Sequence, residues 1–294
     1  ELHIVDHNSS DNTREILTHL KQERLPIHIY HYNELEFAPE RVLNHMMQHI
    51  LNNDADIDYI FPLDADEFIY CPSREKLNAF LTLIPQNRVV MYIWRGYLPS
   101  STEYDPDFIC HFTDQRKEEI LTPKVIIPRA IAETCILTIG SHYMIDRDGK
   151  EIKSTVFIEP NNQQFYYWFI ERFQAEFIIT NDLWLGHYPI RSTPQQIKKV
   201  LEKSITMVME KKGYRDLAWE SQLRDLLSQE MKISLDELRT IAYKYRASNA
   251  EQTQVARQQP LRLTKLTLKY KNLINNDPLP VLAKLILDLA EKLR

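Results

Sequence analysis

Two hydrophobic periods alternate along the first hundred residues. Short apolar runs typical of strands occupy residues 1–6, 27–32, 58–63 and 89–94. Between them, apolar residues recur at helical spacing over residues 11–22, 39–52 and 74–84, the last with Ser73 as the expected N-cap. Strands and helices in this order predict an α/β domain with a mixed, mainly parallel sheet, flanked by helices and joined by right-handed crossovers.

The middle of the chain departs from this regular order. Residues 97–120 contain prolines and a charged stretch, and we expect them to form a long irregular segment. Strands are predicted at 124–131 and 134–139, and a D-G pair predicts a hairpin turn at 146–150. Residues 161–177 are rich in aromatic side chains, which either offer a stacking surface for sugars or pack in the core.

From Thr193 onward the pattern is helical. Thr193, Pro194 and Gln196 have the form of an N-cap, a first-turn proline and a capping-box partner. Further helices are expected at about 215–229, 234–247, 260–275 and 280–294. We therefore divide the chain into a first domain of residues 1–192 and a helical C-terminal region of residues 193–294.

The end of the chain is basic. Residues 251–294 contain eight Lys and Arg against four Asp and Glu, a local balance of +4. A basic amphipathic helix of this kind can lie on an anionic membrane surface, here the inner face of the membrane. The same helices can instead pack on the first domain or join two copies of the chain, and the sequence leaves these uses open.

Composition narrows the class of protein. The formal net charge of −5 argues against nucleic acid as a partner. The cysteines, three in number and without C-x-x-C spacing, are expected to be reduced thiols of a cytoplasmic protein. No apolar run reaches the roughly 18 residues of a transmembrane helix. Neither G-x-G-x-x-G nor a P-loop occurs, so a divalent metal becomes the expected neutraliser of any bound diphosphate.

Two carboxylates follow the apolar run that ends at Leu63. Asp64 and Asp66 are two positions apart, so in a continuing strand the pleat would place them on one face. Ligands of open α/β sheets bind at the carboxyl ends of strands. Two hard oxygen ligands there suit Mg²⁺ or Mn²⁺, which completes its shell with waters and substrate phosphates. The alternative is an acidic turn without a metal.

A second acidic stretch follows the first strand. Asp6 stands at the carboxyl end of that strand, and Ser10 or Asp11 is the expected N-cap of the helix that follows. In a parallel sheet Asp6 would lie beside Asp64, where its carboxylate could accept hydrogen bonds from a nucleobase or ribose. The alternative is that Asp6 only caps its own turn.

A late stretch supplies a histidine and an arginine. His187 can complete a metal shell, because neutral imidazole binds Mn²⁺-type ions. Arg191 can clamp a diphosphate with its forked donors. Each residue alone is compatible with an ordinary surface or core contact, and only the combination with the two acidic stretches favours a site.

Together the three stretches resemble the glycosyltransferase family 2-like proteins of the GT-A fold. The pattern is D-x-x-S-x-D-x-T from Asp6 to Thr13, then D-A-D-E-F from Asp64, then H-Y-x-x-R-S from His187. The resemblance covers about residues 1–200 and implies an earlier strand and helix before Glu1. It departs from the pattern at one position, where His7 replaces an Asp of many members.

The resemblance also implies roles. Asp6 and Asp11 would lie on the nucleotide side, Asp64 would hold the metal and the donor diphosphate, and Asp66 would hold the metal. His187 would lie near the metal, and Arg191 near the phosphates. Together these roles imply a nucleotide-diphospho-sugar donor and Mn²⁺ or Mg²⁺.

Acceptor and base are less defined. By the resemblance, the acceptor is a glycan or a lipid-linked precursor in surface polysaccharide biosynthesis. The acceptor side and the catalytic base come from the middle of the chain, where His142 and Asp146 are the candidates. A structural hydrogen bond is the alternative for His142 and turn formation for Asp146. Two other functions remain open, a GT-A-like nucleotidyltransferase and a non-catalytic carbohydrate-binding or scaffold protein.

Overall fold

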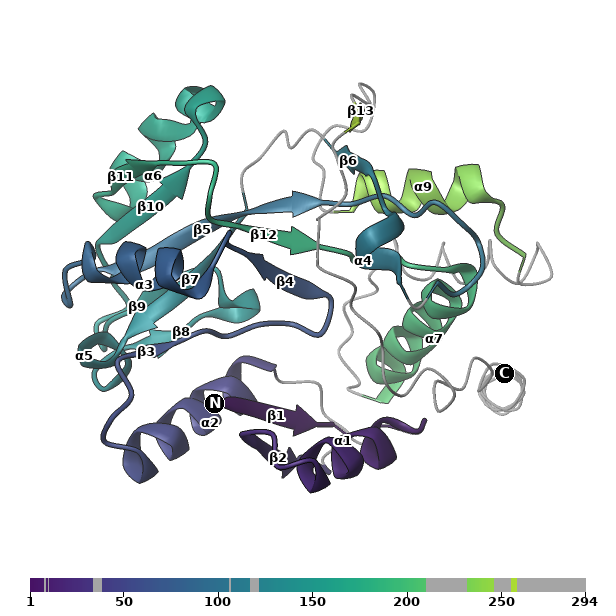
Figure 1. Cartoon of the computed structure of the whole chain (residues 1–294), viewed down its shortest axis with the longest axis horizontal. Helices are drawn as coiled ribbons and strands as arrows, with labels where there is room; N and C mark the ends of the chain where they lie inside the picture. The colour runs from purple at the N-terminus through teal and green to yellow at the C-terminus, as the bar shows by residue number, and fades with distance from the viewer. Residues whose placement is uncertain are drawn as a thin grey trace.

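The protein is described by a computed structural model that defines residues 1–7, 9, 11–33, 39–105, 107–116, 122–209, 232–245 and 255–257 (Figure 1). The strands are β1 (Leu2–Asp6), β2 (Ile27–His31), β3 (Tyr59–Ile60), β4 (Glu67–Tyr70), β5 (Val89–Gly96), β6 (Asp114–Arg116), β7 (Pro123–Pro128), β8 (Ile136–Leu137), β9 (Met144–Ile145), β10 (Ser154–Ile158), β11 (Glu176–Ile179), β12 (Trp184–His187) and β13 (Val255–Arg257). The helices are α1 (Thr13–Gln22), α2 (Pro39–Asn53), α3 (Arg74–Thr82), α4 (Phe108–His111), α5 (Arg129–Ala132), η1 (Ile139–Ser141), η2 (Pro160–Phe165), α6 (Tyr166–Phe173), α7 (Thr193–Met209) and α9 (Leu235–Lys244).

A seven-stranded mixed sheet forms the centre of the molecule. Its path runs β11-β10-β5-β12-β4, and β7 joins the other side of β5 and also pairs with β3. β5 is parallel to β10 and β12 and antiparallel to β7. The prediction of a mixed α/β fold with flanking helices is therefore confirmed for the part of the chain that the structure describes (Figure 1).

The first two strands form a sheet of their own. β1 and β2 are parallel, with Leu2 opposite Ile27 and Asp6 opposite His31, as the predicted strand–helix–strand unit requires. Within the described residues neither strand hydrogen-bonds to β3. The prediction that Asp6 and Asp64 end adjacent strands of one parallel sheet is therefore wrong.

β3 is shorter than the apolar pattern predicted. It pairs antiparallel with β7 through Tyr59 and Ile60 only, although the apolar run continues to Leu63. Pro62 has no backbone N–H to donate to a neighbouring strand, which explains why the ladder ends before it. The chain then turns and enters β4, a strand that the sequence analysis did not predict.

The core on one face of the sheet contains part of the aromatic segment. Phe169 and Phe173 of α6 are buried in the same cluster as Met91 of β5 and Val156 of β10. Tyr167, by contrast, is 70% exposed. Core packing therefore accounts for the inward side of this segment, because a helix alternates buried and exposed faces.

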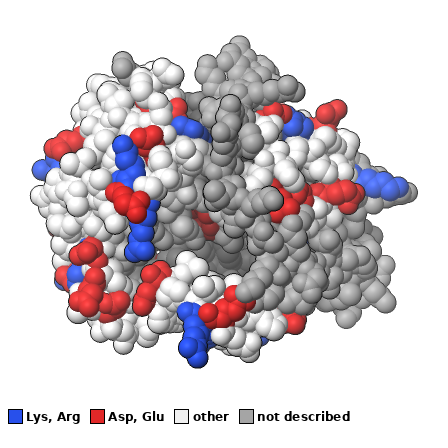
Figure 2. All heavy atoms as spheres, viewed as in Figure 1, with Lys and Arg blue, Asp and Glu red and all other residues white. Residues whose placement is uncertain are grey.

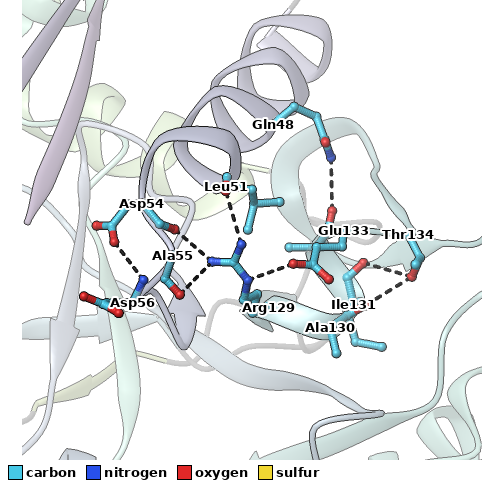
Figure 3. Close-up of polar contacts among 11 residues, drawn as sticks. Gln48, Leu51, Asp54, Ala55, Asp56, Arg129, Ala130, Ile131, Glu133 and Thr134 are labelled. Atoms are coloured by element: carbon cyan, nitrogen blue, oxygen red, sulfur yellow. Dashed lines mark hydrogen bonds and ion pairs between the residues drawn. The ribbon is translucent and has the colours of Figure 1, made fainter.

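Arg129, which directly follows β7, hydrogen-bonds to the C-terminal end of α2. Its guanidinium donates to the carbonyl oxygens of Leu51 and Asp54 and to the carboxylate of Glu133, so one side chain satisfies carbonyls at a helix C-terminus (Figure 3).

Two strands of the middle of the chain are shorter than predicted. The strand expected at 124–131 ends at Pro128 and continues as α5, and the strand expected at 134–139 is reduced to β8.

Several local predictions hold. Ser73 caps α3 through a hydrogen bond of 3.1 Å from the Lys76 N–H to its hydroxyl. The helix expected at 234–247 is α9, which opens with a capping box between Ser234 and Glu237. The helices predicted at 215–229, 260–275 and 280–294 lie outside the described residues.

The described surface shows no single dominant charge in the view of Figure 2. There, Lys and Arg side chains are interspersed with Asp and Glu side chains rather than gathered into one broad patch. Within the described part of the chain, no helix combines the length and the hydropathy needed to cross a bilayer.

Candidate functional site

The D-A-D stretch and the late histidine lie together because two strands pair. β4 runs antiparallel to β12 with Glu67 opposite His187. The Tyr188 N–H also donates to the Asp66 carbonyl oxygen over 2.9 Å. Residues more than a hundred positions apart are thus joined through their backbones. The structure brings together two of the three stretches that the sequence analysis singled out.

The two aspartates diverge instead of sharing one face. Asp64 and Asp66 lie in a turn between β3 and β4, so the pleat argument does not apply to them. Asp64 Oδ2 is 2.9 Å from Lys124 Nζ. Asp66 Oδ1 is 3.9 Å from His187 Nε2 and Asp66 Oδ2 is 3.9 Å from Lys199 Nζ. The prediction of two carboxylates on one strand face is therefore wrong.

Lys124 is a buried cation beneath this turn. Its side chain has no exposed surface and contacts both Asp64 and Glu67, the latter at 3.2 Å. Burial raises the pKa of Glu67 to about 7, as does the charge of Asp64, while Lys124 pulls that pKa down. Glu67 Oε2 also accepts the Asp64 N–H at 2.9 Å. This network fixes the shape of the acidic turn.

Asp66 occupies a mixed electrostatic environment. Burial raises the pKa of Asp66, and the negative charge of Asp64 acts in the same direction. The cations Lys199 and Arg191 oppose this shift. A metal ion bound at this carboxylate would stabilise its charged form, which burial disfavours.

The separation of Asp66 and His187 is compatible with one divalent metal held between them. Bonds of about 2.1 Å are typical for Mg²⁺ and close to those of related ions, so one ion can bridge the 3.9 Å gap between Asp66 Oδ1 and His187 Nε2. One carboxylate and one imidazole suit Mn²⁺ and leave positions for waters and phosphate oxygens. Asp64 is engaged by Lys124 and lies outside this pair. Among the described residues, the cluster that already gathers three possible ligands is a different one, Glu1, His3 and His28.

His187 is held by aromatic rings. Its side chain is 3% exposed and stacks on Trp94 at a centroid distance of 4.0 Å. His142 meets the same Trp94 ring edge-on at 5.3 Å, so both histidines contact one indole. Trp94 stands in an apolar run without any distinguishing pattern, so its contact with both histidines could not be predicted from the sequence.

The tautomer of His142 follows from its hydrogen bond. Nδ1 lies 2.8 Å from the Pro123 carbonyl oxygen, which can only accept, so Nδ1 carries the proton. In the neutral ring the lone pair is then on Nε2, as a general base requires. A left-handed turn at Gly140 (φ 74°) and Ser141 (φ 57°) places the ring. A Cβ at position 140 would lie 2.5 Å from His142 Nε2.

The other base candidate is engaged locally. Asp146 Oδ1 accepts hydrogen bonds from the N–H groups of Asp148 and Lys150, at 3.0 and 2.8 Å. These bonds are those of a turn-forming aspartate. Among the described contacts, Asp146 has none with Asp66 or His187. Its hydrogen bonds are therefore those expected of the turn-forming alternative.

Arg191 has a buried donor group, and its charge acts on Asp66. Within the described residues, Arg191 Nε is buried and has no hydrogen-bond partner, while its guanidinium lies 5.4 Å from the Phe108 ring centroid. A buried, unsatisfied cationic donor is costly unless a ligand or water accepts from it. Its position near Asp66 makes it suited to an anion bound beside a metal.

The first acidic stretch has internal partners. Asp6 accepts from the Ser9 N–H at 3.0 Å and from Arg14 Nε at 2.6 Å, and its side chain is fully buried. Asp11 accepts from Thr13 and lies 3.4 Å from Lys198 on α7. Asp6 therefore caps its turn, the alternative considered from the sequence, and its contact with a nucleobase stays a prediction.

Asp6 gives a pH-dependent stability. Burial would raise its pKa, but hydrogen bonds from Ser9, Arg14 and His31 outweigh this and hold it at about 2, below the ordinary 3.8. A lowered pKa stabilises the fold above pH ~4 by about 2 kcal/mol, and this contribution is lost as the pH falls toward 2. Urea unfolding should show Asp6→Asn less stable than the wild type at pH 7, with the difference shrinking below pH 4. A difference that stays constant with pH would contradict this assignment.

Three cationic residues of the site were missed by sequence reasoning. Lys124 stands in the apolar strand P-K-V-I-I-P, where a charge is unusual and indicates a buried partner. Lys198 and Lys199 lie on a predicted helix, but nothing in their spacing shows that they face acidic residues. Only the packing of α7 reveals that relation.

The described fold is consistent with the GT-A type of glycosyltransferase fold. A mixed sheet flanked by helices carries an acidic turn, a histidine and an arginine at one place. The family model of glycosyl transferase family 2 matches residues 1–147, half of the chain. The chain belongs to this family, whose members in general transfer sugars from nucleotide-sugar donors to glycan acceptors and commonly use divalent metal ions. Neither the curated proteins nor the solved structures contain a match.

Proposed function

We propose that the protein is a metal-dependent glycosyltransferase that moves a sugar from a nucleotide-diphospho-sugar to a glycan or lipid-linked acceptor, in surface polysaccharide biosynthesis. The observation that carries this proposal is that Asp66 lies 3.9 Å from His187 and close enough to Arg191 for the charge of Arg191 to act on its carboxylate, while Arg191 Nε lacks a hydrogen-bond partner among the described residues. Family membership supports the class of reaction, and the site supports the use of a metal.

Each side chain has a defined task in this account. Asp66 and His187 would hold Mn²⁺ or Mg²⁺, which when bound offsets the charge of the leaving diphosphate. Arg191 would donate to a phosphate oxygen with the Nε that lacks another partner. Asp64, fixed by Lys124, would border the donor diphosphate. Such preorganised charges act most strongly where water is excluded.

The acceptor hydroxyl needs a base if the reaction inverts the anomeric centre. We place His142 in this role because its Nδ1–H bond to Pro123 leaves Nε2 as an acceptor, and because Trp94 joins it to His187. His142 Nε2 would take the proton of the acceptor hydroxyl as the new glycosidic bond forms. Asp146 is less suited, because its carboxylate is used by its own turn.

Product analysis separates the proposed function from its two alternatives. The protein is incubated with a panel of UDP- and GDP-sugars, Mn²⁺ and glycan or lipid-linked acceptors, and in a parallel reaction with pyrophosphate in place of the acceptor. EDTA is the control for both reactions, and the products are identified. A transferase releases the nucleoside diphosphate in a metal-dependent reaction. Consumption of pyrophosphate with release of a sugar phosphate and a nucleoside triphosphate would instead identify a nucleotidyltransferase. No turnover with any donor and acceptor would favour the non-catalytic alternative.

Substitutions around His142 test the base. We expect His142→Gln to lower the transfer rate by about 10²–10⁴-fold, the range of general-base catalysis, without changing donor binding. Gly140→Ala should also lower the rate, because its Cβ would displace the imidazole and strain a left-handed residue by about 1–2 kcal/mol. The matched control is Gly149→Ala, where φ is also positive but nothing lies within 4 Å of the added Cβ. Full activity of His142→Gln would exclude it as the base.

A further inference from the structure

Helix α7 carries two consecutive lysines that reach different acidic segments. Lys198 Nζ is 3.4 Å from Asp11 Oδ2, and Lys199 Nζ is 3.9 Å from Asp66 Oδ2. Asp11 precedes α1 and Asp66 precedes β4, so one helix places a cation beside each of the two acidic stretches. Figure 1 shows α7 beside this part of the molecule, between the small β1–β2 sheet and α9.

Lys199 has neutral partners besides its carboxylate. Its ammonium lies 3.4 Å from the Pro189 carbonyl oxygen and 4.9 Å from the centroid of the Tyr245 ring. A carbonyl and an aromatic face both attract a cation without cancelling its charge. Since the contact with Asp66 is long and the side chain is 31% exposed, the ammonium can change its anionic partner.

The two oxygens of Asp66 face different cations. Oδ1 faces His187, where the metal fits, and Oδ2 faces Lys199. A divalent ion and an ammonium on one carboxylate repel each other. The loss of Lys199 from Asp66 is therefore favoured when a metal binds, and a donor diphosphate on that metal would offer the ammonium a new anion.

We propose that Lys199 is an exchangeable counter-ion of the site. It pairs with Asp66 when the metal is absent, and it pairs with the diphosphate of the donor when the metal occupies Asp66. This role rests on the proposed function, because it requires a metal-bound diphosphate. Lys199 would then add a second cation beside Arg191 to the charge that stabilises the leaving group.

Lys124 does not share this role. It is fully buried and bonds Asp64 and Glu67 at 2.9 and 3.2 Å, so it has neither the freedom nor the exposure to change partners. The structure thus assigns the two lysines near the acidic turn to different tasks. Lys124 is a fixed support, whereas Lys199 moves its charge between two anions.

The test measures two affinities of Lys199→Met. Without nucleotide, Mn²⁺ affinity is read from the electron paramagnetic resonance of free Mn²⁺, and we expect it to rise roughly tenfold because a competing unit charge is removed. With saturating Mn²⁺, the affinity for UDP or GDP by calorimetry should fall about tenfold, the value of one charge-assisted hydrogen bond. Lys199→Arg should stay near the wild type in both measurements. Lys76→Met, which removes an exposed lysine paired with Asp182, is the control.

Opposite shifts of the two affinities support the exchange, since a merely structural lysine would weaken both or neither. Parallel losses, or no change in either affinity, would overturn it. If the wild type binds nucleotide with Mn²⁺ but Lys199→Met binds it equally well, only this inference fails. If the wild type shows no metal-dependent nucleotide binding, the proposed function fails together with it.

Discussion

Replacing Asp66 by Asn should lower the rate of sugar transfer by about 10²–10³-fold, the cost of losing one preorganised electrostatic contact in an active site. Asn keeps the size of the side chain but removes the negative charge that faces both His187 and Lys199. Of the two proposed ligands, which are both among the described residues, His187 alone would then remain to coordinate the metal. Steady-state kinetics with the best donor, over a range of Mn²⁺ concentrations, measures the effect.

The same substitution should not destabilise the protein. Burial raises the pKa of Asp66, so the fold disfavours its charge, and a neutral Asn removes that penalty. We therefore expect an unchanged or higher melting temperature together with the loss of activity, as is common at functional sites. Asp182→Asn removes an exposed carboxylate elsewhere and is the matched control. Activity within tenfold of the wild type would exclude Asp66 as a metal ligand.

Replacing Lys124 by Met should reduce the free energy of unfolding by about 3 kcal/mol. Removing one partner of a buried ion pair typically costs about 3–5 kcal/mol, because the other charge stays buried without compensation. Here Glu67 would be left in that state, with no exposed side-chain surface. The lower end of the range applies, because a carboxyl whose pKa is already about 7 can take up a proton.

A double substitution separates charge from packing. Lys124→Met combined with Glu67→Gln removes both charges, and we expect it to recover more than half of the lost stability in urea unfolding at pH 7. Lys76→Met, whose exposed ion pair with Asp182 contributes at most about 1 kcal/mol, is the control. A loss below 1 kcal/mol for Lys124→Met would show that the buried network does not support the acidic turn.

Elements with a clear period were predicted well from the sequence. β1, α1, β2, α2, α3 and β5 lie close to the expected ranges, because each depends on its own apolar spacing or cap. The bounds of β3 and the existence of β4 were not predicted, since Pro62 ends the β3 ladder and both strands pair with segments that are distant in the sequence. The apolar spacing within a segment indicates whether the segment is extended, whereas the length and register of its pairing depend on the partner strand.

The same distinction explains the candidate site. The motif residues Asp66 and His187 do meet, but the sequence could not show that a turn directs Asp64 to Lys124 instead. For Asp146 the sequence left two roles open, catalytic base and turn-forming residue. Its carboxylate accepts hydrogen bonds from the N–H groups of Asp148 and Lys150, as a turn-forming residue does, and these bonds depend on the backbone geometry of the turn. The positions of Lys124, Lys198 and Lys199 beside acidic residues could not be predicted, because they depend on the tertiary packing of β7 and α7.

A metal-dependent donor site at Asp66 and His187 is tested most directly by calorimetric binding of UDP and GDP to the wild-type protein and to Asp66→Ala, each with and without Mn²⁺. We expect one nucleotide to bind the wild type tightly only with Mn²⁺, and Asp66→Ala to lose this binding while remaining folded. Nucleotide binding that ignores both the metal and Asp66, or no binding under any condition, would contradict a metal-dependent donor site at Asp66 and His187.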